Sequence, residues 1–521
     1  MNEDLRKNVQ NSAKGSLILL IGQVLSTVLS AFGIILVARI LGATSFGVVS
    51  VALVPLGFAS IISDWGVSSA LTKYLSQYRH EDKPENRRLL IESALIMNTI
   101  IGIALSFALY LSSSYIAQNL FKQPEIEILI KYSSLSLIGT SFLRTSWAVA
   151  VGYERMELRI GTTIIYSLLK SIVGPVLVYL GYGPVGAILG GSTPVLFSGM
   201  IGLVIIWTLW RSETPIKPSM NHIEGMQFLL QYGYPLFLSA LIAGVIPSIT
   251  SFLLALNVSN ELIGNYNAGI RFSTLIAFFS MPIATVMFPL FSKLENDYIA
   301  LKTVYQNSVK FTAIVILPVA MVITALADQI VTVIYDTGYE QTPLFMKIYL
   351  LIFILNGFGG INTGNLLNGL QETRVNLHAS IVGFLTTIPL SFILIPRIGV
   401  IGLMTASILG STIGLAYRLN WVQSNLKFTI LWGTSTKTLI ASAAAYLATT
   451  LFVSLIQTNP WIQLTLGGLL YLATYFTAII TLKILTPTDL NYMETIFSSL
   501  GPFSNVFLMI LRVIGKLSGY Q

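Results

Sequence analysis

Long apolar runs separated by short polar segments cover the chain from about residue 15 to residue 485. A helix needs about 20 mostly apolar residues to cross a bilayer. Fourteen segments satisfy this rule: 15–39, 46–72, 91–112, 127–151, 160–181, 184–210, 227–255, 262–290, 304–327, 342–367, 376–396, 398–421, 436–457 and 462–485. The pattern therefore predicts an all-α polytopic membrane protein with about 14 transmembrane helices.

The chain also repeats its own pattern. The stretch ILGATSFGVVSVA resembles NVSNELIGNYNAG, and Gly47 matches Gly264 (264 − 47 = 217). The stretches VGYERMELR and NGLQETRVN match Gly152 to Gly369 at the same offset. Each repeat holds six predicted spans, an even number, so both halves enter the membrane in the same direction. Such repeats are related by a pseudo-twofold axis along the membrane normal, and transporters that work by alternating access bind substrate between them.

The duplication divides the chain into four predicted parts. These are an N-terminal six-helix lobe (1–215), a C-terminal six-helix lobe (216–425), two additional transmembrane helices (426–486) and a cytoplasmic or interfacial amphipathic tail (487–521). The tail contains FSNVFLMILRVIG, which is too short to span a bilayer and is typical of a helix lying at the membrane surface.

Composition and charge agree with a membrane protein and indicate its orientation. Only 10% of the residues are charged and 54% are hydrophobic, so the net charge of +8 belongs to loops and does not indicate a nucleic-acid partner. With the N-terminus inside, 22 of the 30 Lys and Arg residues fall in cytoplasmic segments, 5 fall outside and 3 lie within spans. This asymmetry predicts that both termini are cytoplasmic.

Three basic residues lie well inside predicted spans, away from their ends, and a charge costs about 2.5–3.5 kcal/mol at the bilayer centre. Lys170 is the deepest, and Arg144 and Arg271 follow. Each is a candidate to bind an anionic substrate group, because a guanidinium contacts phosphate through paired hydrogen bonds. The structural alternatives are an ion pair with Asp64 for Lys170 and Arg144, and snorkelling to the interface for either arginine.

Asp64 is the one acid in the middle of a predicted span, within SDWGVSSALTKYL. We interpret it as the counter-ion of a buried cation. The alternative is a proton or sodium site that couples transport to an ion gradient.

Four further residues are candidates for substrate contacts. Trp147 shares a helix face with Arg144 at i+3 and offers a ring that can stack on a sugar. Asn362 and Asn365 lie on one helix face and either bind sugar hydroxyls or form inter-helix hydrogen bonds. Arg39 closes the first span, where we expect an interfacial anchor and, as the weaker alternative, a substrate contact.

The sequence offers no catalytic motif. There is no phosphate-binding glycine loop, no paired metal-ligand cluster and no recognisable Ser/His/Asp arrangement, and cysteine is absent. We therefore expect neither an enzyme nor a bound cofactor or metal.

The elements ARILGATSFG, SDWGVSSALTKYLSQY and GYERM, together with the whole span pattern, resemble the Wzx-type polysaccharide flippases of the multidrug/oligosaccharidyl-lipid/polysaccharide (MOP) exporter superfamily. The resemblance implies a flippase in the cell membrane that moves a polyprenyl-(pyro)phosphate-linked oligosaccharide to the outer leaflet, with lipids and that substrate as partners and H⁺ or Na⁺ coupling left open. The alternative that it implies is a cation-coupled small-molecule antiporter of the multidrug-exporting (MATE-like) branch.

Overall fold

A computed structural model describes residues 3–81, 86–211, 220–456, 458–487 and 489–490. These residues form helices joined by turns, and no β-strand occurs among them. Eight helical stretches of the described chain are long and apolar enough to cross a membrane, or nine if one bent pair is counted as a single span. The chain is therefore an all-helical, multi-pass membrane protein.

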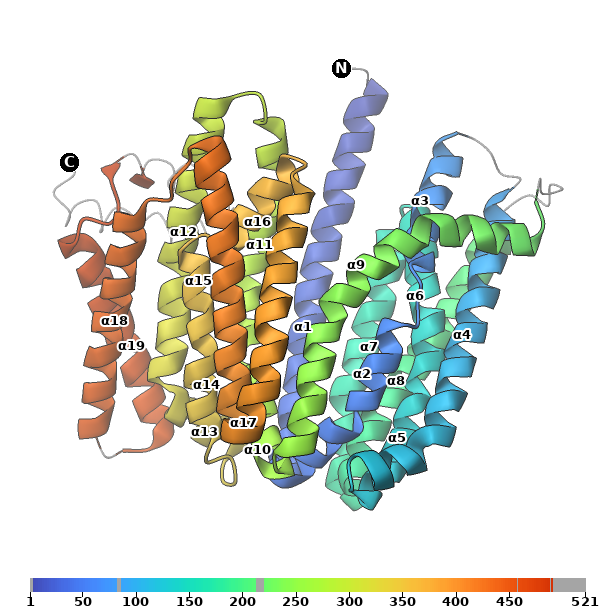
Figure 1. Cartoon of the computed structure of the whole chain (residues 1–521), viewed down its shortest axis with the longest axis horizontal. Coiled ribbons are helices and arrows are strands. Elements are labelled where there is room, and N and C mark those ends of the chain that lie inside the picture. The colour runs from blue at the N-terminus through green and yellow to red at the C-terminus, as the bar shows by residue number, and fades with distance from the viewer. Residues whose placement is uncertain (1–2, 82–85, 212–219, 457, 488, 491–521) are drawn as a thin grey trace. The chain divides into compact units, whose positions relative to one another are not determined.

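The chain separates into two compact units (Figure 1). Unit 1 comprises residues 1–268 with the short segment 395–400, and unit 2 comprises residues 269–394 and 401–521.

The helices of unit 1 account for the first half of the chain. They are α1 (Glu3–Ala52), α2 (Val54–Ile61), α3 (Val67–His80), α4 (Arg87–Tyr115), α5 (Glu127–Ser134), α6 (Ser136–Gly152), α7 (Met156–Leu177), α8 (Gly183–Arg211), α9 (His222–Asn257) and α10 (Asn260–Ile270), which ends at the border with unit 2.

Small residues let the helices of unit 1 pack backbone to backbone. A β-carbon on Gly190 would lie 2.1 Å from the Cα of Gly174, where α8 runs along α7. A β-carbon on Gly33 would lie 2.4 Å from the Cα of Ser171, where α1 meets α7. Close packing through small residues is how membrane helices associate when the hydrophobic effect between them is weak.

The helices of unit 2 follow. They are α11 (Ser273–Lys293), α12 (Tyr298–Ala325), α13 (Ala327–Tyr335), α14 (Thr342–Leu350), α15 (Ile354–Gly357), α16 (Gly360–Gly369), α17 (Thr373–Leu426), α18 (Trp432–Leu455) and α19 (Pro460–Thr481). Within α17 the backbone turns at Ile398 and Gly399, and the two arms pack on each other where Gly410 meets Thr387.

Some of the predicted spans contain a break inside the apolar run. Span 46–72 is interrupted at residues 62–66, span 262–290 at Arg271–Phe272 and span 342–367 around Gly359. Gly359 adopts φ +94°, a left-handed conformation that suits glycine. Hydropathy does not reveal such breaks, because the residues on both sides of each one are apolar.

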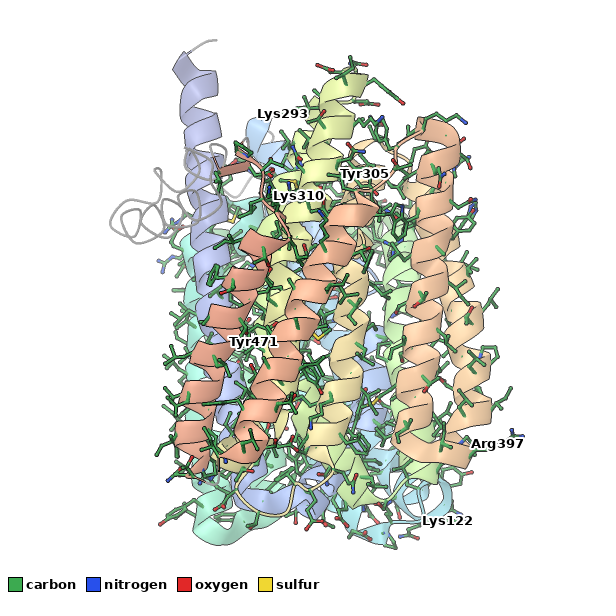
Figure 2. All side chains as sticks on the ribbon, turned by 90° about the vertical axis from the view of Figure 1, so that its left-hand side faces the viewer. Lys122, Lys293, Tyr305, Lys310, Arg397 and Tyr471 are labelled. Carbon is green, nitrogen blue, oxygen red and sulfur yellow. The ribbon has the colours of Figure 1, made fainter. Side chains whose placement is uncertain are left out.

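An ion pair in unit 2 ties α12 to the segment after α19. Lys310, labelled on α12 in Figure 2, bonds to Asp489, and the two residues are only 5% and 4% exposed. Asp489 also accepts a hydrogen bond of 2.6 Å from the backbone N–H of Thr486. The predicted amphipathic tail continues beyond this point, but residues 491–521 lie outside the described part of the chain.

Candidate functional site

The break at residues 62–66 creates the candidate site. Trp65 and Gly66 both adopt positive φ angles, +48° and +76°, and α3 starts immediately afterwards. Gly66 lies against the backbone of α9, since a β-carbon on it would be 2.1 Å from the carbonyl oxygen of Gly233. Two glycines from distant parts of the chain therefore allow the broken span and α9 to touch.

Asp64 lies in this break and faces the start of α3. Its Oδ1 accepts hydrogen bonds from the hydroxyl of Ser68 and from the Ser68 backbone N–H at 3.2 Å. The first turn of a helix has unsatisfied N–H groups and a partial positive charge that favours a carboxylate. Among the residues that the structure describes, no lysine or arginine forms an ion pair with Asp64. The α3 terminus therefore stabilises this carboxylate.

Arg144 reaches the same break from α6. One of its Nη atoms donates to the hydroxyl of Ser63 at 2.8 Å, and that hydroxyl donates in turn to the carbonyl of Ser60, also at 2.8 Å. A guanidinium carries five N–H donors. The hydrogen bond to Ser63 is the one interaction of Arg144 within the described chain, so several donors remain unused.

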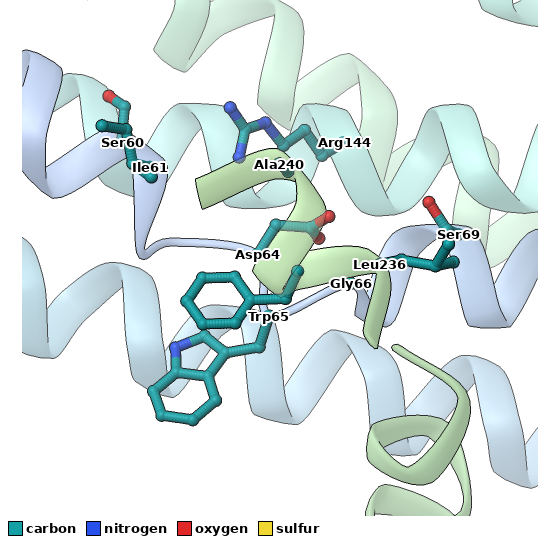
Figure 3. Close-up of a pocket in the computed structure, with 10 residues that line it drawn as sticks. Ser60, Ile61, Asp64, Trp65, Gly66, Ser69, Arg144, Leu236 and Ala240 are labelled. Carbon is teal, nitrogen blue, oxygen red and sulfur yellow. The ribbon is translucent and has the colours of Figure 1, made fainter. Parts of the chain in front are cut away.

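Asp64 and Arg144 line one cavity of about 390 Å³ within unit 1 (Figure 3). Its wall comes from the broken span, from α6 and from α9. The remaining lining residues are Ser60, Ile61, Trp65, Gly66, Ser69, Leu236, Phe237 and Ala240. The cavity thus places one cation, one carboxylate and two hydroxyls among apolar and aromatic side chains, the usual composition of a small-molecule site.

Three other candidates of unit 1 lie outside this wall. Trp147 donates from its indole N–H to Thr162 at 3.0 Å, so its polar edge is engaged with α7. Lys170 lies with its ammonium 5.6 Å from the ring centroid of Tyr166, one helical turn earlier. Arg39 is exposed and lies close to Gly42, whose φ of +74° bends α1.

The remaining candidates belong to unit 2. Arg271 lies between α10 and α11 with an exposed side chain. Asn362 is 0% exposed, and neither polar atom of its side-chain amide has a hydrogen-bond partner among the described residues. The amide nitrogen of Asn365 is also buried without a partner.

Sequence reasoning did not single out Trp65, Ser69 and Phe237 for this cavity. A signal for the first was present in Asp64-Trp65-Gly66, because glycine is one of the strongest local signals for an interruption of regular structure. Phe237 could not be found in this way, since it approaches from α9, far along the chain. The described residues hold no group of three His, Asp or Glu side chains suited to a metal ion.

Comparison with known proteins places the chain in a family. Residues 36–343, more than half of the chain, match the family of polysaccharide biosynthesis proteins. The "Probable low-salt glycan biosynthesis flippase Agl15" of Haloferax volcanii is 22% identical over 479 residues, which cover 89% of this chain and 95% of that protein.

Two solved structures share the fold. The lipid II flippase MurJ in an inward closed conformation superposes with a TM-score of 0.70 at 17% identity, covering 89% of this chain and 99% of its own. An inward-facing multidrug resistance MATE family transporter of the MOP superfamily superposes with a TM-score of 0.64 at 17% identity, covering 77% and 94%.

The family match and the shared fold confirm the resemblance noted in the sequence. They also agree with the absence of any catalytic motif in the chain. The chain belongs to the family of polysaccharide biosynthesis proteins, as its resemblance to the Wzx-type flippases implied, and it has the fold of the MurJ flippase and of the MATE transporter.

Proposed function

We propose that this transporter moves a polyprenyl-(pyro)phosphate-linked oligosaccharide from the cytoplasmic to the outer leaflet of the cell membrane by alternating access. The cavity of unit 1 is the observation that carries the proposal. It holds an arginine with unused donors next to a carboxylate and two serine hydroxyls, in a wall whose other side chains are apolar or aromatic. The guanidinium can donate hydrogen bonds to a phosphate. The carboxylate and the serine hydroxyls can form hydrogen bonds with the hydroxyls of a sugar.

The proposal includes the full transport architecture: fourteen crossings, two six-helix lobes related by a pseudo-twofold axis along the membrane normal, and two additional helices. A reciprocal contact between duplicated positions supports the axis. A β-carbon on Gly47 would lie 1.7 Å from the carbonyl oxygen of Asn260, and one on Gly264 would lie 1.9 Å from that of Ala43. Ala43 and Asn260 are also related by the duplication, so each half makes the same contact on the other, as an isologous contact requires.

Orientation with both termini cytoplasmic is also proposed, and it rests on the distribution of basic residues. The 22 Lys and Arg residues on one predicted side, against 5 on the other, support it.

The other predicted residues enter the proposal as additional contacts to the substrate. Lys170 and Arg271 supply further positive charge, and neither forms an ion pair among the described residues. Trp147, Asn362, Asn365 and Arg39 complete the predicted set, in supporting roles.

A cation-coupled small-molecule antiporter is the second candidate. It is favoured by the free Oδ2 of Asp64, which accepts no hydrogen bond from the described residues. In that function Asp64 binds the coupling ion and the cavity wall binds an apolar substrate.

Headgroup translocation in proteoliposomes tests the two candidates. The protein is reconstituted with a lipid-linked oligosaccharide, and exposure of the sugar on the trans side is measured with and without a proton or sodium gradient. We expect protein-dependent exposure that falls about tenfold or more in Arg144→Ala, since a hydrogen bond to a charged group contributes about 1.5–3 kcal/mol.

Arg211→Ala is the matched control, because Arg211 lies exposed at the end of α8 beside Trp207. If Arg144→Ala and wild type expose equal amounts of the sugar on the trans side, the cavity has no role in translocation. Gradient-driven efflux of a small cation that depends on Asp64, without glycan translocation, would identify the antiporter.

A further inference from the structure

Two stacked aromatic rings form one side of the cavity. Trp65 and Phe237 stack with ring centroids 5.4 Å apart and an interplanar angle of 6°. Phe237 is 8% exposed, whereas Trp65 is 40% exposed and lines the cavity beside Asp64 (Figure 3). Phe237 therefore supports one face of the indole and leaves Trp65 accessible from the cavity.

The backbone of Trp65 is held in an unusual conformation. Its φ of +48° is rare for a bulky residue. Residues keep such backbone conformations only where the surrounding structure holds them there, and these residues concentrate at functional sites. The packing of Gly66 on Gly233 imposes the turn here, and the turn places the indole next to the carboxylate.

Polar groups with unused hydrogen-bonding capacity surround the indole. The Oδ2 of Asp64 accepts no hydrogen bond within the described chain. The hydroxyls of Ser60 and Ser69 likewise have no partner among the residues that are described. Most donors of Arg144 are also unused.

This combination has a specific chemical match. An aromatic ring offers a flat apolar surface whose negative face attracts the C–H groups of a pyranose ring. A carboxylate accepts hydrogen bonds from two neighbouring hydroxyls, and a guanidinium pairs with a carboxylate or a phosphate. A sugar ring beside an anionic group presents all three of these features within one small molecule.

We infer that the unit 1 cavity is a recognition subsite for one sugar residue next to an anionic group, with Trp65 as its stacking platform. Asp64 accepts from the hydroxyls of the ring, and Arg144 binds the anion. A volume of about 390 Å³ lies at the low end of ligand pockets, about 300–1,000 Å³, and suits one ring and not a whole oligosaccharide. The inference rests on the proposed function, because it identifies the part of the headgroup that this site recognises.

The anion has two chemical sources. It is either a carboxylate carried by the sugar itself or the phosphate that joins the first sugar to the lipid. Methyl glucuronide and glucose 1-phosphate represent the two sources, and neutral methyl glucoside represents neither.

Saturation-transfer NMR on the purified full-length protein in lipid nanodiscs tests the subsite directly. We expect wild-type protein to bind methyl glucuronide or glucose 1-phosphate, with the ring C–H groups receiving the strongest transfer, and to bind methyl glucoside about tenfold more weakly. The stronger of the two anionic ligands identifies the source of the anion. Arg144→Ala should abolish the preference for the anionic sugar without removing the transfer to ring protons.

Trp65→Gly is the decisive variant, because glycine accepts a φ of +48° and removes the ring without straining the turn. We expect it to raise the dissociation constant about tenfold, whereas Trp65→Phe keeps binding. Trp207→Gly is the control, since Trp207 is an exposed tryptophan on α8 outside the cavity wall.

Unchanged binding in Trp65→Gly, or equal binding of the neutral and anionic sugars, would overturn the subsite. No sugar binding by a protein that still translocates a lipid-linked glycan would overturn the subsite and leave the proposed function intact. Sugar binding that depends on Trp65, without translocation of any glycan, would support the subsite and contradict the flippase.

Discussion

Gly47 and Gly264 pack directly against each other's helices, and each occupies the same position in its half of the duplicated chain. A β-carbon on Gly47 would lie 1.7 Å from the Asn260 carbonyl oxygen, and a β-carbon on Gly264 would lie 1.9 Å from that of Ala43. Both atoms belong to the backbone, so no side-chain movement relieves the clash. The two helices must separate if either glycine gains a side chain.

Replacing either glycine with alanine is therefore expected to destabilise the protein by about 1–3 kcal/mol, the usual cost of overpacking. The same replacement at Gly161, where nothing lies within 4 Å of a β-carbon, is the control. There alanine should be neutral or stabilising by about 0.5–1 kcal/mol, because it favours the helix. Thermal unfolding of the detergent-purified variants measures the difference, and equal shifts at Gly47 and Gly161 would contradict the contact.

Asp64 offers a way to separate charge from structure. Its Oδ1 accepts a hydrogen bond from one backbone N–H in the first turn of α3, that of Ser68, as an N-cap side chain does, and loss of a capping bond costs about 0.5–2 kcal/mol. Asp64→Ala should therefore lower the unfolding temperature, whereas Asp64→Asn, which keeps a capping oxygen, should not. If both variants melt alike, the capping role is wrong. If Asp64→Asn is as stable as wild type, a transport defect in this variant is caused by the loss of charge alone. A defect that depends on a proton or sodium gradient indicates ion coupling, and a defect that does not depend on the gradient indicates sugar binding.

The Lys310–Asp489 pair predicts strongly coupled substitutions. Both residues are almost fully buried, so removing one leaves an uncompensated charge and is expected to cost about 3–5 kcal/mol. Lys310→Met together with Asp489→Leu removes both charges and should recover most of that loss. Fluorescence-detected gel filtration after heating measures the stability of Lys310→Met, of Asp489→Leu and of the double variant. Additive losses in the double variant would show that the two residues do not act as a pair.

Low pH should weaken the Lys310–Asp489 ion pair. Burial alone would raise the pKa of Asp489, but hydrogen bonds from Lys310 and Thr486 outweigh it, so the pKa lies below its usual value. A carboxylate with a lowered pKa stabilises the folded state above its unfolded pKa, about 3.9, and this stabilisation is lost as the pH falls below that value.

The gap in unfolding temperature between wild type and Asp489→Asn is therefore expected to stay constant from pH 7 to about pH 5 and to shrink below about pH 4. A melting series in matched buffers measures the gap. A gap that closes already between pH 7 and pH 6 would contradict the lowered pKa.

Hydropathy and charge by themselves determined the class of this protein. Apolar runs of about 20 residues and low charge content predicted an all-helical membrane protein. The matched glycines at positions 47 and 264 predicted a duplication, because glycine recurs where helices approach closely. These features are legible in the sequence because each depends on local composition or on a direct repeat.

Only the tertiary structure decided how the interior charges are stabilised. The sequence predicts that Asp64 offsets a buried cation; the structure adds its hydrogen bonds to the start of α3, in a break that Gly66 and Gly233 make possible together. Lys310 lies in the predicted span 304–327, and the structure shows it buried against Asp489 near the far end of the chain. Both outcomes depend on contacts between segments more than 150 residues apart, and no local pattern of apolar and polar residues encodes which distant segment will meet them.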